Sequence, residues 1–424
     1  MRRIYYDPFT RRMDIGEFVL SAAEEAAFEA RWQEIKNKYK SVYIYLLYYI
    51  SIIGEMVGRY LLIRREERDE DALYVLLPSD EVRFGVQVAN RFACEYIGVC
   101  GEEDLDFWWY VLLRHRGDIN EDIDRFVIRD SLPCFFQKAY SVGHHFTDEQ
   151  VERGEEALKA MGVTGPFVCL AARTSKYTDH IQRFKTFPRI PDDESIYAHR
   201  NMDFRDYGKA IAWLGEQGIQ CVKMGRFEDP LDPPIPNCID YAGYHASDFM
   251  DLYTFSRCDF TVSCMSGIAL LANLFAKPVL YVNSGVFSVG NAGVPYTEHD
   301  MFITKTFYAA DTGVYRHPMT FREKFDAEKD RDISLRHLIE RGIKWSDNTE
   351  DEILDAVKEM VARIDGTWAD TEEDEIRLER WWQLCDEMEV FRRGRDHLIK
   401  LDGGGPLPIP PATTFLRRHP YLVE

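Results

Sequence analysis

Residues that could bind a phosphate group follow the apolar run Phe260–Ser263. Ser266 and Gly267 stand at the start of a helix pattern, where they would offer backbone N–H groups, a hydroxyl and the positive end of a helix dipole to an anion. A glycine there would also let a diphosphate approach the backbone closely. The equal alternative is structural, with Ser266 as a helix cap and Gly267 as a packing residue.

Basic residues follow two other apolar runs. Lys223 and Arg226 flank Gly225 at the end of the run 219–224, and they offer a point charge and a bidentate fork to phosphate oxygens. The loop after the run 167–172 is long for a connection between a strand and a helix. Its cations are Arg173, Lys176, Arg183, Lys185, Arg189, Arg200 and Arg205. We expect this loop to attract an anionic ligand, and a solvated loop with no ligand is the alternative.

Two further patterns carry weaker signals. Asp240 and Tyr241 would lie near a nucleoside base or pack in the core. Asp104 and Asp106 form a D-x-D pattern, which in some sugar transferases binds a metal together with a diphosphate, but such patterns arise easily among 72 acidic residues. The motifs of serine hydrolases, zinc proteases, P-loop NTPases and dinucleotide-binding enzymes do not occur. We therefore predict no metal and no cofactor.

The composition sets limits on the partners and the compartment. The 424 residues predict two or three domains, and a net charge of −20 argues against nucleic acid as a partner. Nine cysteines without a C-x-x-C pair indicate a reducing compartment without disulfides. The longest apolar run, Val42–Ile53, is shorter than the ~20 residues of a spanning helix. We predict a cytoplasmic protein, with peripheral attachment to the inner face of the membrane as the alternative.

Apolar runs alternate with helix patterns along the chain, which indicates βαβ units and parallel sheets. The expected strands are 42–53, 72–77, 106–113, 167–172, 219–224, 260–263 and 278–283. The expected helices are 14–39, 54–65, 82–96, 147–162, 205–218, 248–256, 267–276, 349–365 and 371–401. Ligands of parallel sheets bind at the carboxyl ends of the strands, which is where the basic residues and the Ser266–Gly267 pair are expected.

This pattern predicts an α/β fold of two Rossmann-like domains that face a cleft. The predicted parts are a helical segment 1–40, an acceptor-side domain 41–145, a hinge 146–162, a donor-side domain 163–365, and a C-terminal helix with a Pro-rich tail 366–424. The last long helix would pack back across the domains, with Trp381 and Trp382 as its buried stripe.

The run from Phe167 to Asn283 resembles a bacterial family of glycosyltransferases encoded in surface-polysaccharide loci. The matching blocks are 169–173 with Tyr177, 197–203, 222–225, 239–242, 248–251, 263–267 and 275–283, and a weaker resemblance covers 40–424. The resemblance implies a GT-B-like, metal-independent glycosyltransferase with the nucleotide-sugar on the C-terminal domain. The implied donor-binding residues are Arg173, Tyr177, Arg200, Asn201, Lys223, Gly225, Arg226, Asp240, Tyr241, Ser263, Ser266, Gly267 and Asn283.

Two departures from the family pattern affect the predicted chemistry. The family has an Ile-Gly-His turn where this chain has Ile53-Gly54-Glu55, so Glu55 would replace the histidine as the base that deprotonates the acceptor hydroxyl. The helix after Gly267 also carries Leu270-Leu271 in place of the glutamate that binds ribose in many transferases of this architecture.

The implied reaction transfers a sugar from a UDP-, GDP- or CMP-sugar to a glycan or lipid-linked acceptor. A sugar-nucleotide epimerase or a pyruvyl or fucosyl transferase on the same architecture is one alternative. A non-catalytic scaffold that binds a nucleotide-sugar is the other.

Overall fold

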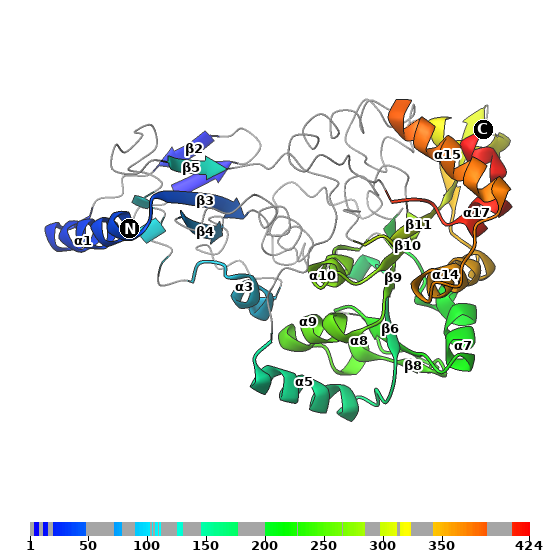
Figure 1. The fold of residues 1–424 in the computed structure, drawn as a ribbon, viewed down its shortest axis with the longest axis horizontal. Helices are drawn as coiled ribbons and strands as arrows, with labels where there is room; N and C mark the ends of the chain where they lie inside the picture. The colour runs from blue at the N-terminus through cyan, green and yellow to red at the C-terminus, as the bar shows by residue number, and fades with distance from the viewer. Residues whose placement is uncertain are drawn as a thin grey trace. The chain divides into compact units, whose positions relative to one another are not determined.

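The structure of the protein, a computed structural model, describes several stretches of the chain. These are residues 4–7, 12–15, 20–47, 72–78, 90–101, 104, 107–108, 110–111, 125–129, 146–176, 200–226, 228–264, 266–284, 297–311, 314–323, 342–387 and 409–424. The backbone contacts divide the chain into two units, Met1–Leu132 and Pro133–Glu424 (Figure 1). Each unit contains a parallel sheet and helices, so the predicted α/β class is confirmed.

The first unit is built on a three-stranded parallel sheet. Strand β3 (Ser41–Leu47) lies between β4 (Ala72–Pro78) and β5 (Arg125–Arg129) and pairs in parallel with both. Helix α1 (Ala22–Lys38) buries Phe28 and Trp32 against this sheet. The sheet core therefore depends on the helix that precedes it in the sequence.

Three smaller elements also belong to the first unit. Strands β1 (Ile4–Asp7) and β2 (Arg12–Ile15) pair antiparallel. Helix α3 (Arg91–Ile97) begins after Asn90, whose side chain accepts the N–H of Ala93. It ends at Gly98, whose φ of 76° suits a glycine.

The predicted strand 106–113 is wrong, because the described residues of this stretch are helical. Trp108 and Val111 are both buried in the core of the first unit. Their spacing of three residues places them on one face of a helix. An apolar run this short fits a buried strand and a buried helix equally well, and here the helix forms.

The second unit contains a six-stranded parallel sheet. Its order is β11-β10-β9-β6-β7-β8, and all its neighbouring strands are parallel. The strands are β6 (Phe167–Ala171), β7 (Gln220–Met224), β8 (Cys238–Ile239), β9 (Thr261–Ser263), β10 (Val279–Ser284) and β11 (Met301–Thr304). From the central strand β6, the chain adds β7 and β8 on one side, and it then adds β9, β10 and β11 on the other.

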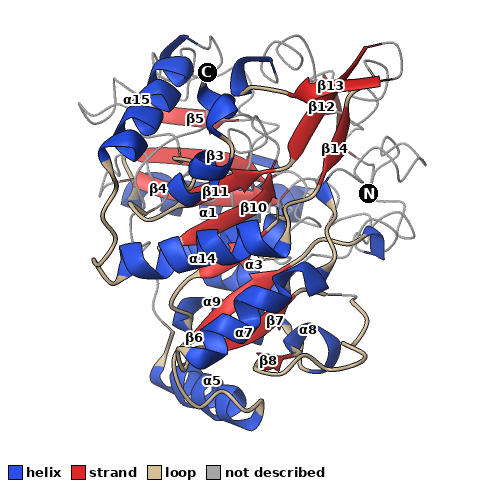
Figure 2. Cartoon of the chain, turned by 90° about the vertical axis from the view of Figure 1, so that its right-hand side faces the viewer, coloured by secondary structure: helices blue, strands red, loops and turns tan. Residues whose placement is uncertain are grey.

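Helices lie on both faces of this sheet, with α7 and α14 on one face and α9 and α10 on the other (Figures 1 and 2). The helices are α5 (Asp148–Ala160), η3 (Phe204–Tyr207), α7 (Gly208–Glu216), α8 (Tyr241–Tyr244), α9 (Asp248–Arg257), η4 (Gly267–Ala269), α10 (Leu270–Leu274) and α14 (Glu350–Ile364). Thr147 and Thr349 start α5 and α14 with capping boxes, so the predicted starts of these helices are confirmed.

A small antiparallel sheet, absent from the sequence prediction, follows β11. Strand β12 (Thr306–Asp311) pairs with β13 (Val314–Pro318) and β14 (Lys344–Ser346). Helix α15 (Glu372–Glu387) buries Trp381 against Phe302 and Phe321. Trp382 is only partly buried, because neighbouring helical residues point in different directions, so the predicted two-tryptophan stripe reduces to Trp381.

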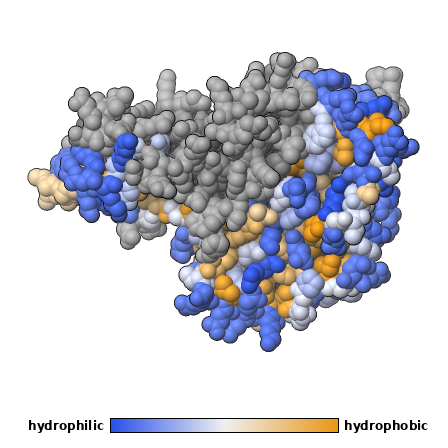
Figure 3. Space-filling model, in the orientation of Figure 1, coloured by the Kyte–Doolittle hydropathy of each residue, from blue (hydrophilic) through white to orange (hydrophobic). Residues whose placement is uncertain are grey.

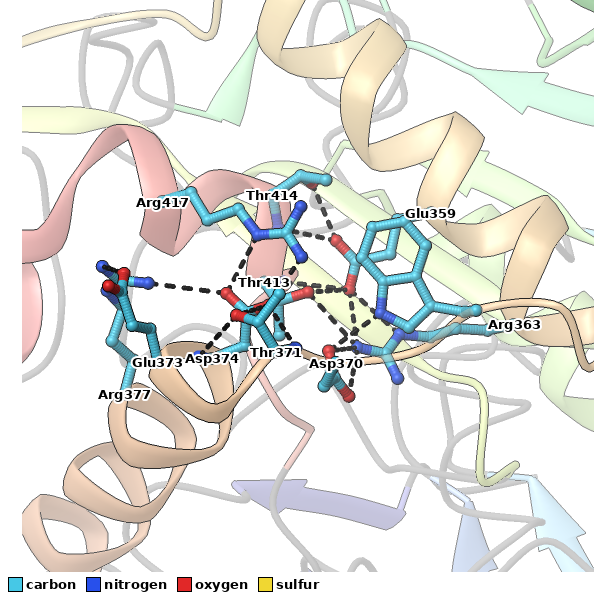
Figure 4. Close-up of polar contacts among 11 residues, drawn as sticks. Glu359, Arg363, Asp370, Thr371, Glu373, Asp374, Arg377, Thr413, Thr414 and Arg417 are labelled. Atoms are coloured by element: carbon cyan, nitrogen blue, oxygen red, sulfur yellow. Dashed lines mark hydrogen bonds and ion pairs between the residues drawn. The ribbon is translucent and has the colours of Figure 1, made fainter.

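The C-terminal segment, which we define as residues 409–424, is bound to α14 and α15 by charged groups (Figure 4). It contains α17 (Thr413–Arg418) and η5 (Pro420–Val423). Glu359 of α14 is fully buried, and its carboxylate accepts hydrogen bonds from the N–H and hydroxyl groups of Thr413 and Thr414 at 2.8–2.9 Å. Asp374 of α15 accepts two hydrogen bonds from Arg417. The segment therefore belongs to the second unit.

The C-terminal segment also contacts β11, which is an outermost strand of the six-stranded sheet. Pro411 forms a parallel bridge with Phe302 of β11, whose N–H donates to the carbonyl of Pro410 at 3.1 Å. The predicted Pro-rich tail thus ends beside an edge strand, where a missing N–H is tolerated.

The visible surfaces of α1 and α5 are mostly hydrophilic (Figure 3). Among the side chains that the structure describes, the large exposed hydrophobic residues are Tyr244 and Ile376. Within the described ranges, every helix is too short or too polar to cross a membrane.

Candidate functional site

The carboxyl ends of the strands meet at one edge of the six-stranded sheet. Ala171, Met224 and Ser263 are aligned across β6, β7 and β9, so the residues after these strands share one edge. The strands that end before Arg173 and Arg226 are direct neighbours in the sheet. The direction in which strands are added reverses between β6 and β9. Parallel sheets bind their ligands at such a switch point.

Arg173, Asn201 and Ser266 are brought together at this switch point. The backbone N–H of Arg173 donates to Sγ of Cys264 at 2.9 Å, and its guanidinium donates to Oδ1 of Asn201. The carbonyl of Cys264 accepts the N–H of Ser266 at 2.6 Å. The hydroxyl of Ser266 makes no capping bond to the described residues of η4. The structure therefore joins Arg173 and Ser266 through Cys264, and Asn201 through the guanidinium of Arg173.

Positive charge gathers around the Cys264 thiol. Burial raises the pKa of this thiol to about 11, while the nearby charges of Arg200, Arg173 and Lys305 act to lower it. The side chain of Lys305 is buried, and its ammonium donates to the carbonyl of Asn201 at 3.2 Å and pairs with Asp347. The sequence analysis did not select Lys305. This lysine directly follows the apolar run Met301–Thr304, as the other predicted basic residues follow apolar runs, and that position could have identified it.

Lys223 and Arg226 are engaged with carboxylates of the chain. The ammonium of Lys223 is buried, donates to the carbonyl of Asp229 at 2.8 Å and lies 3.2 Å from Asp240. The guanidinium of Arg226 pairs with two carboxylates of α9, Asp248 at 2.5 Å and Asp251 at 2.6 Å. A phosphate at either cation would have to compete with these carboxylates.

Hydrogen bonds connect the loop after β7 to the residues after β8. Gly225 has a φ of 144°, which favours glycine. Asp240 accepts the N–H groups of Leu231 and Gly243 and thereby caps α8. The buried Tyr241 donates its hydroxyl to Asp251 at 2.7 Å. Tyr241 is thus a core residue, which was the open alternative to base binding.

Ser263 and Asn283 are also buried and bonded within the protein. Ser263 donates its hydroxyl to the carbonyl of Cys264 at 2.7 Å. Asn283 has a φ of 52°, and its N–H and Oδ1 pair reciprocally with Oδ1 and N–H of Asn348, both at 2.6 Å. These two residues hold the backbone near the carboxyl ends of β9 and β10. Asn348, which the sequence analysis missed, fixes the backbone of Asn283 near the end of β10.

Other predicted residues lie elsewhere. Glu55 and Tyr177 lie outside the described residues, as does Asp106. Asp104 belongs to the first unit and pairs with Arg31 at 2.7 Å. Within the described ranges, no group of three or more His, Cys, Asp or Glu side chains could hold a metal ion.

Two carboxylates near this edge were not predicted. Burial raises the pKa of Asp206 to about 6, and the acidic neighbours Asp203, Asp347 and Glu350 add to the shift. Glu228 accepts the hydroxyl of Thr174 on both of its oxygens, at 2.8 and 2.9 Å. That contact links the loop after β6 to the loop after β7. The sequence could not have identified these two carboxylates, because single acidic residues do not stand out in a chain of net charge −20.

No protein-family model matches the chain, and no curated protein matches it. Among solved structures, it is similar to a glycosyl transferase of family 9 from Veillonella parvula DSM 2008, with 11% identity, coverage of 77% of this chain and 98% of that one, and a TM-score of 0.40. It is similar to the E. coli ADP-heptose lps heptosyltransferase II, with 12% identity, coverage of 71% and 97%, and a TM-score of 0.38. It is also similar to the dodecameric iron-containing heptosyltransferase TibC, with 11% identity, coverage of 77% and 78%, and a TM-score of 0.35.

Proposed function

We propose that the protein is a glycosyltransferase that moves a sugar from a nucleotide-sugar to a glycan or lipid-linked acceptor. The observation that carries the proposal is the gathering of Arg173, Arg200 and Lys305 around Cys264, at the switch point of the sheet. The Ser266–Gly267 turn begins two residues further along the chain. The resemblance of the blocks from Phe167 to Asn283 to a glycosyltransferase family supports the same reaction.

The proposed donor site suits a reaction that releases a nucleoside diphosphate. Negative charge develops on the diphosphate as the bond to the sugar breaks, and fixed cations stabilise that charge without reorganisation. Arg173 offers a planar fork for phosphate oxygens. The buried Lys305 adds a second charge, for which a phosphate would have to compete with its partner Asp347. We propose that these groups perform the electrostatic work that a metal ion performs in other enzymes.

Isothermal titration with UDP, GDP, CMP, dTDP and ADP, and with their sugars, tests the donor site. Replacing Arg173 with Ala removes a charge-assisted hydrogen bond of ~1.5–3 kcal/mol, which corresponds to a loss of affinity of roughly one to two decades. Arg257→Ala is the matched control, because Arg257 pairs with Glu155 of α5 at the far end of α9. Failure of every nucleotide to bind the wild-type protein would remove the proposal.

Transfer itself is measured as the release of nucleoside diphosphate in the presence of acceptor. Activity that survives EDTA is expected from a site that uses cations of the chain. Activity that disappears in EDTA and returns with Mn²⁺ would contradict metal independence. Nucleotide binding without turnover on any acceptor would favour the scaffold alternative.

A further inference from the structure

Cys264 makes four hydrogen bonds to described residues, and these bonds connect two strands and a turn. Its N–H donates to the carbonyl of Ala171 at 3.1 Å, which extends the pairing of β6 and β9 one step beyond Ser263. Its sulfur accepts the N–H of Arg173 at 2.9 Å. Its carbonyl accepts the hydroxyl of Ser263 at 2.7 Å and the N–H of Ser266 at 2.6 Å. One residue therefore fixes Arg173 and Ser266 relative to each other.

A thiol suits this position because it can accept the Arg173 N–H without adding charge. The side chain of Cys264 is fully buried, so water does not compete for its sulfur. Burial also keeps the thiol protonated at neutral pH, since its pKa is about 11. A carboxylate in the same place would neutralise the cations that the proposed donor site needs, whereas a neutral thiol leaves their charge available to an anion.

We propose that Cys264 is a positioning residue, which holds Arg173 and the Ser266–Gly267 turn in the arrangement that grips the donor diphosphate. The proposal rests on the proposed function and adds to it a residue that touches no substrate. Cys264 acts through Arg173, because its sulfur orients the peptide from which the guanidinium extends. Loss of the sulfur acceptor lets this peptide reorient and places the guanidinium less often on the phosphate.

Three substitutions distinguish the effect of losing the sulfur acceptor from the effect of changing the volume of the side chain. Cys264→Val fills the space without an acceptor, Cys264→Ala empties it, and Cys264→Ser keeps an acceptor. We expect the Val and Ala variants to bind the nucleoside diphosphate roughly 3- to 10-fold more weakly, as for the loss of one hydrogen bond, and the Ser variant to recover most of the affinity. Cys221→Ala is the matched control, because Cys221 is equally buried in β7 and lies before the edge of the sheet.

A double-mutant cycle distinguishes positioning from general packing. If Cys264 acts through Arg173, then Arg173→Ala should cost less affinity in the Cys264→Val background than in the wild type. The donor KM should rise in the Val variant while kcat stays within a few-fold. A packing role would instead lower the melting temperature of Cys264→Val and Cys221→Ala alike and leave the affinity of both unchanged.

The outcomes separate the two proposals. Wild-type affinity in folded Cys264→Val, together with weakened binding in Arg173→Ala, overturns the positioning role and leaves the function standing. Additive losses in the cycle also overturn it, because the two residues would then act independently. Absence of nucleotide binding by the wild-type protein overturns the function itself. Should the Val variant not fold, the same cycle is run with Cys264→Ala.

Discussion

The aromatic ring of Tyr253 in α9 lies directly against Gly154 in α5, where a Cβ would come within 2.3 Å of the ring carbon Cε1. The ring is held from its other end, because its hydroxyl bonds to the carbonyl of Val151 at 3.1 Å and to Glu155 at 2.8 Å. The absence of a side chain at Gly154 is thus what lets α5 pack on α9.

Gly154→Ala is expected to destabilise the second unit. Alanine favours a helix over glycine by ~1 kcal/mol, but the new methyl group overlaps a fixed ring, and overpacking costs ~1–3 kcal/mol. The melting temperature of the variant should therefore fall. Gly165→Ala is the control, since a Cβ there meets nothing within 4 Å. Equal melting temperatures of Gly154→Ala and the wild type would show that α5 moves away at no cost.

Glu359→Ala is expected to release the C-terminal segment. The substitution removes the acceptor of Thr413 and Thr414 and one of the two carboxylates that pair with Arg363, which keeps Asp370. Breaking a buried charged pair costs ~3–5 kcal/mol, which urea unfolding and protease cleavage near residue 409 would both report. The control is Glu373→Ala, whose exposed pair with Arg377 within α15 is worth at most ~0.5 kcal/mol. Similar losses in the two variants would contradict the buried role of Glu359.

Asp206→Asn is expected to stabilise the protein at neutral pH more than at pH 4. Burial, together with acidic neighbours, raises the pKa of Asp206 to about 6 from 3.8. The folded state thus holds this proton more tightly than the unfolded state, so the free energy of unfolding falls as the pH rises from about 4 to about 6. The asparagine variant lacks this loss, which melting curves between pH 4 and 8 would show.

Asp351 is expected to change stability with pH in the opposite direction to Asp206, and the same melting curves would show it. Its hydrogen bond with Lys209 lowers its pKa, so its contribution is present above pH 4 and is lost as the pH falls. Asp351→Asn should therefore lower the melting temperature slightly at neutral pH. A parallel response of the two asparagine variants to pH would contradict the assignment to Asp206.

Lys223→Met is expected to reduce stability more than nucleotide affinity. It leaves the carboxylate of Asp240 without a buried cation 3.2 Å away, a loss of ~3–5 kcal/mol. The double variant with Asp240→Asn should regain part of that stability, because no charge is then stranded. Isothermal titration calorimetry of the folded variants compares their nucleotide affinity with that of Arg173→Ala. A large loss of affinity in stable Lys223→Met would instead place the ammonium on the phosphate, as the sequence analysis expects.

The elements that the sequence predicts best are those with local signals. Thr147 and Thr349 each precede a partner three residues on, and both start helices through capping boxes. The stretch 106–113 misleads because a short apolar run lacks a period long enough to separate strand from helix. Strand β5 was missed because arginines stand at both of its ends and only its pairing with β3 decides its conformation.

The site residues are harder to predict because their roles depend on partners distant in the sequence. Lys223 resembles a phosphate ligand in the sequence, but in the structure it is paired with Asp240. Asn283 has a structural role because it exchanges two hydrogen bonds with Asn348, which is 65 residues away in the sequence. Arg173 and Asn201 were selected from the sequence and do come together. Cys264 was passed over because a cysteine in an apolar run is usually only a small hydrophobic residue.

The bridge between Phe302 and Pro411 has a consequence for synthesis on the ribosome. Strand β11 is an edge of the six-stranded sheet, and its outer side is joined by a residue that is translated more than a hundred positions later. Until residue 411 has left the exit tunnel, this edge offers unpaired backbone groups to other nascent chains. Translation that stalls between these two positions therefore leaves an aggregation-prone sheet, and holding factors that cover exposed strands would protect it during that interval.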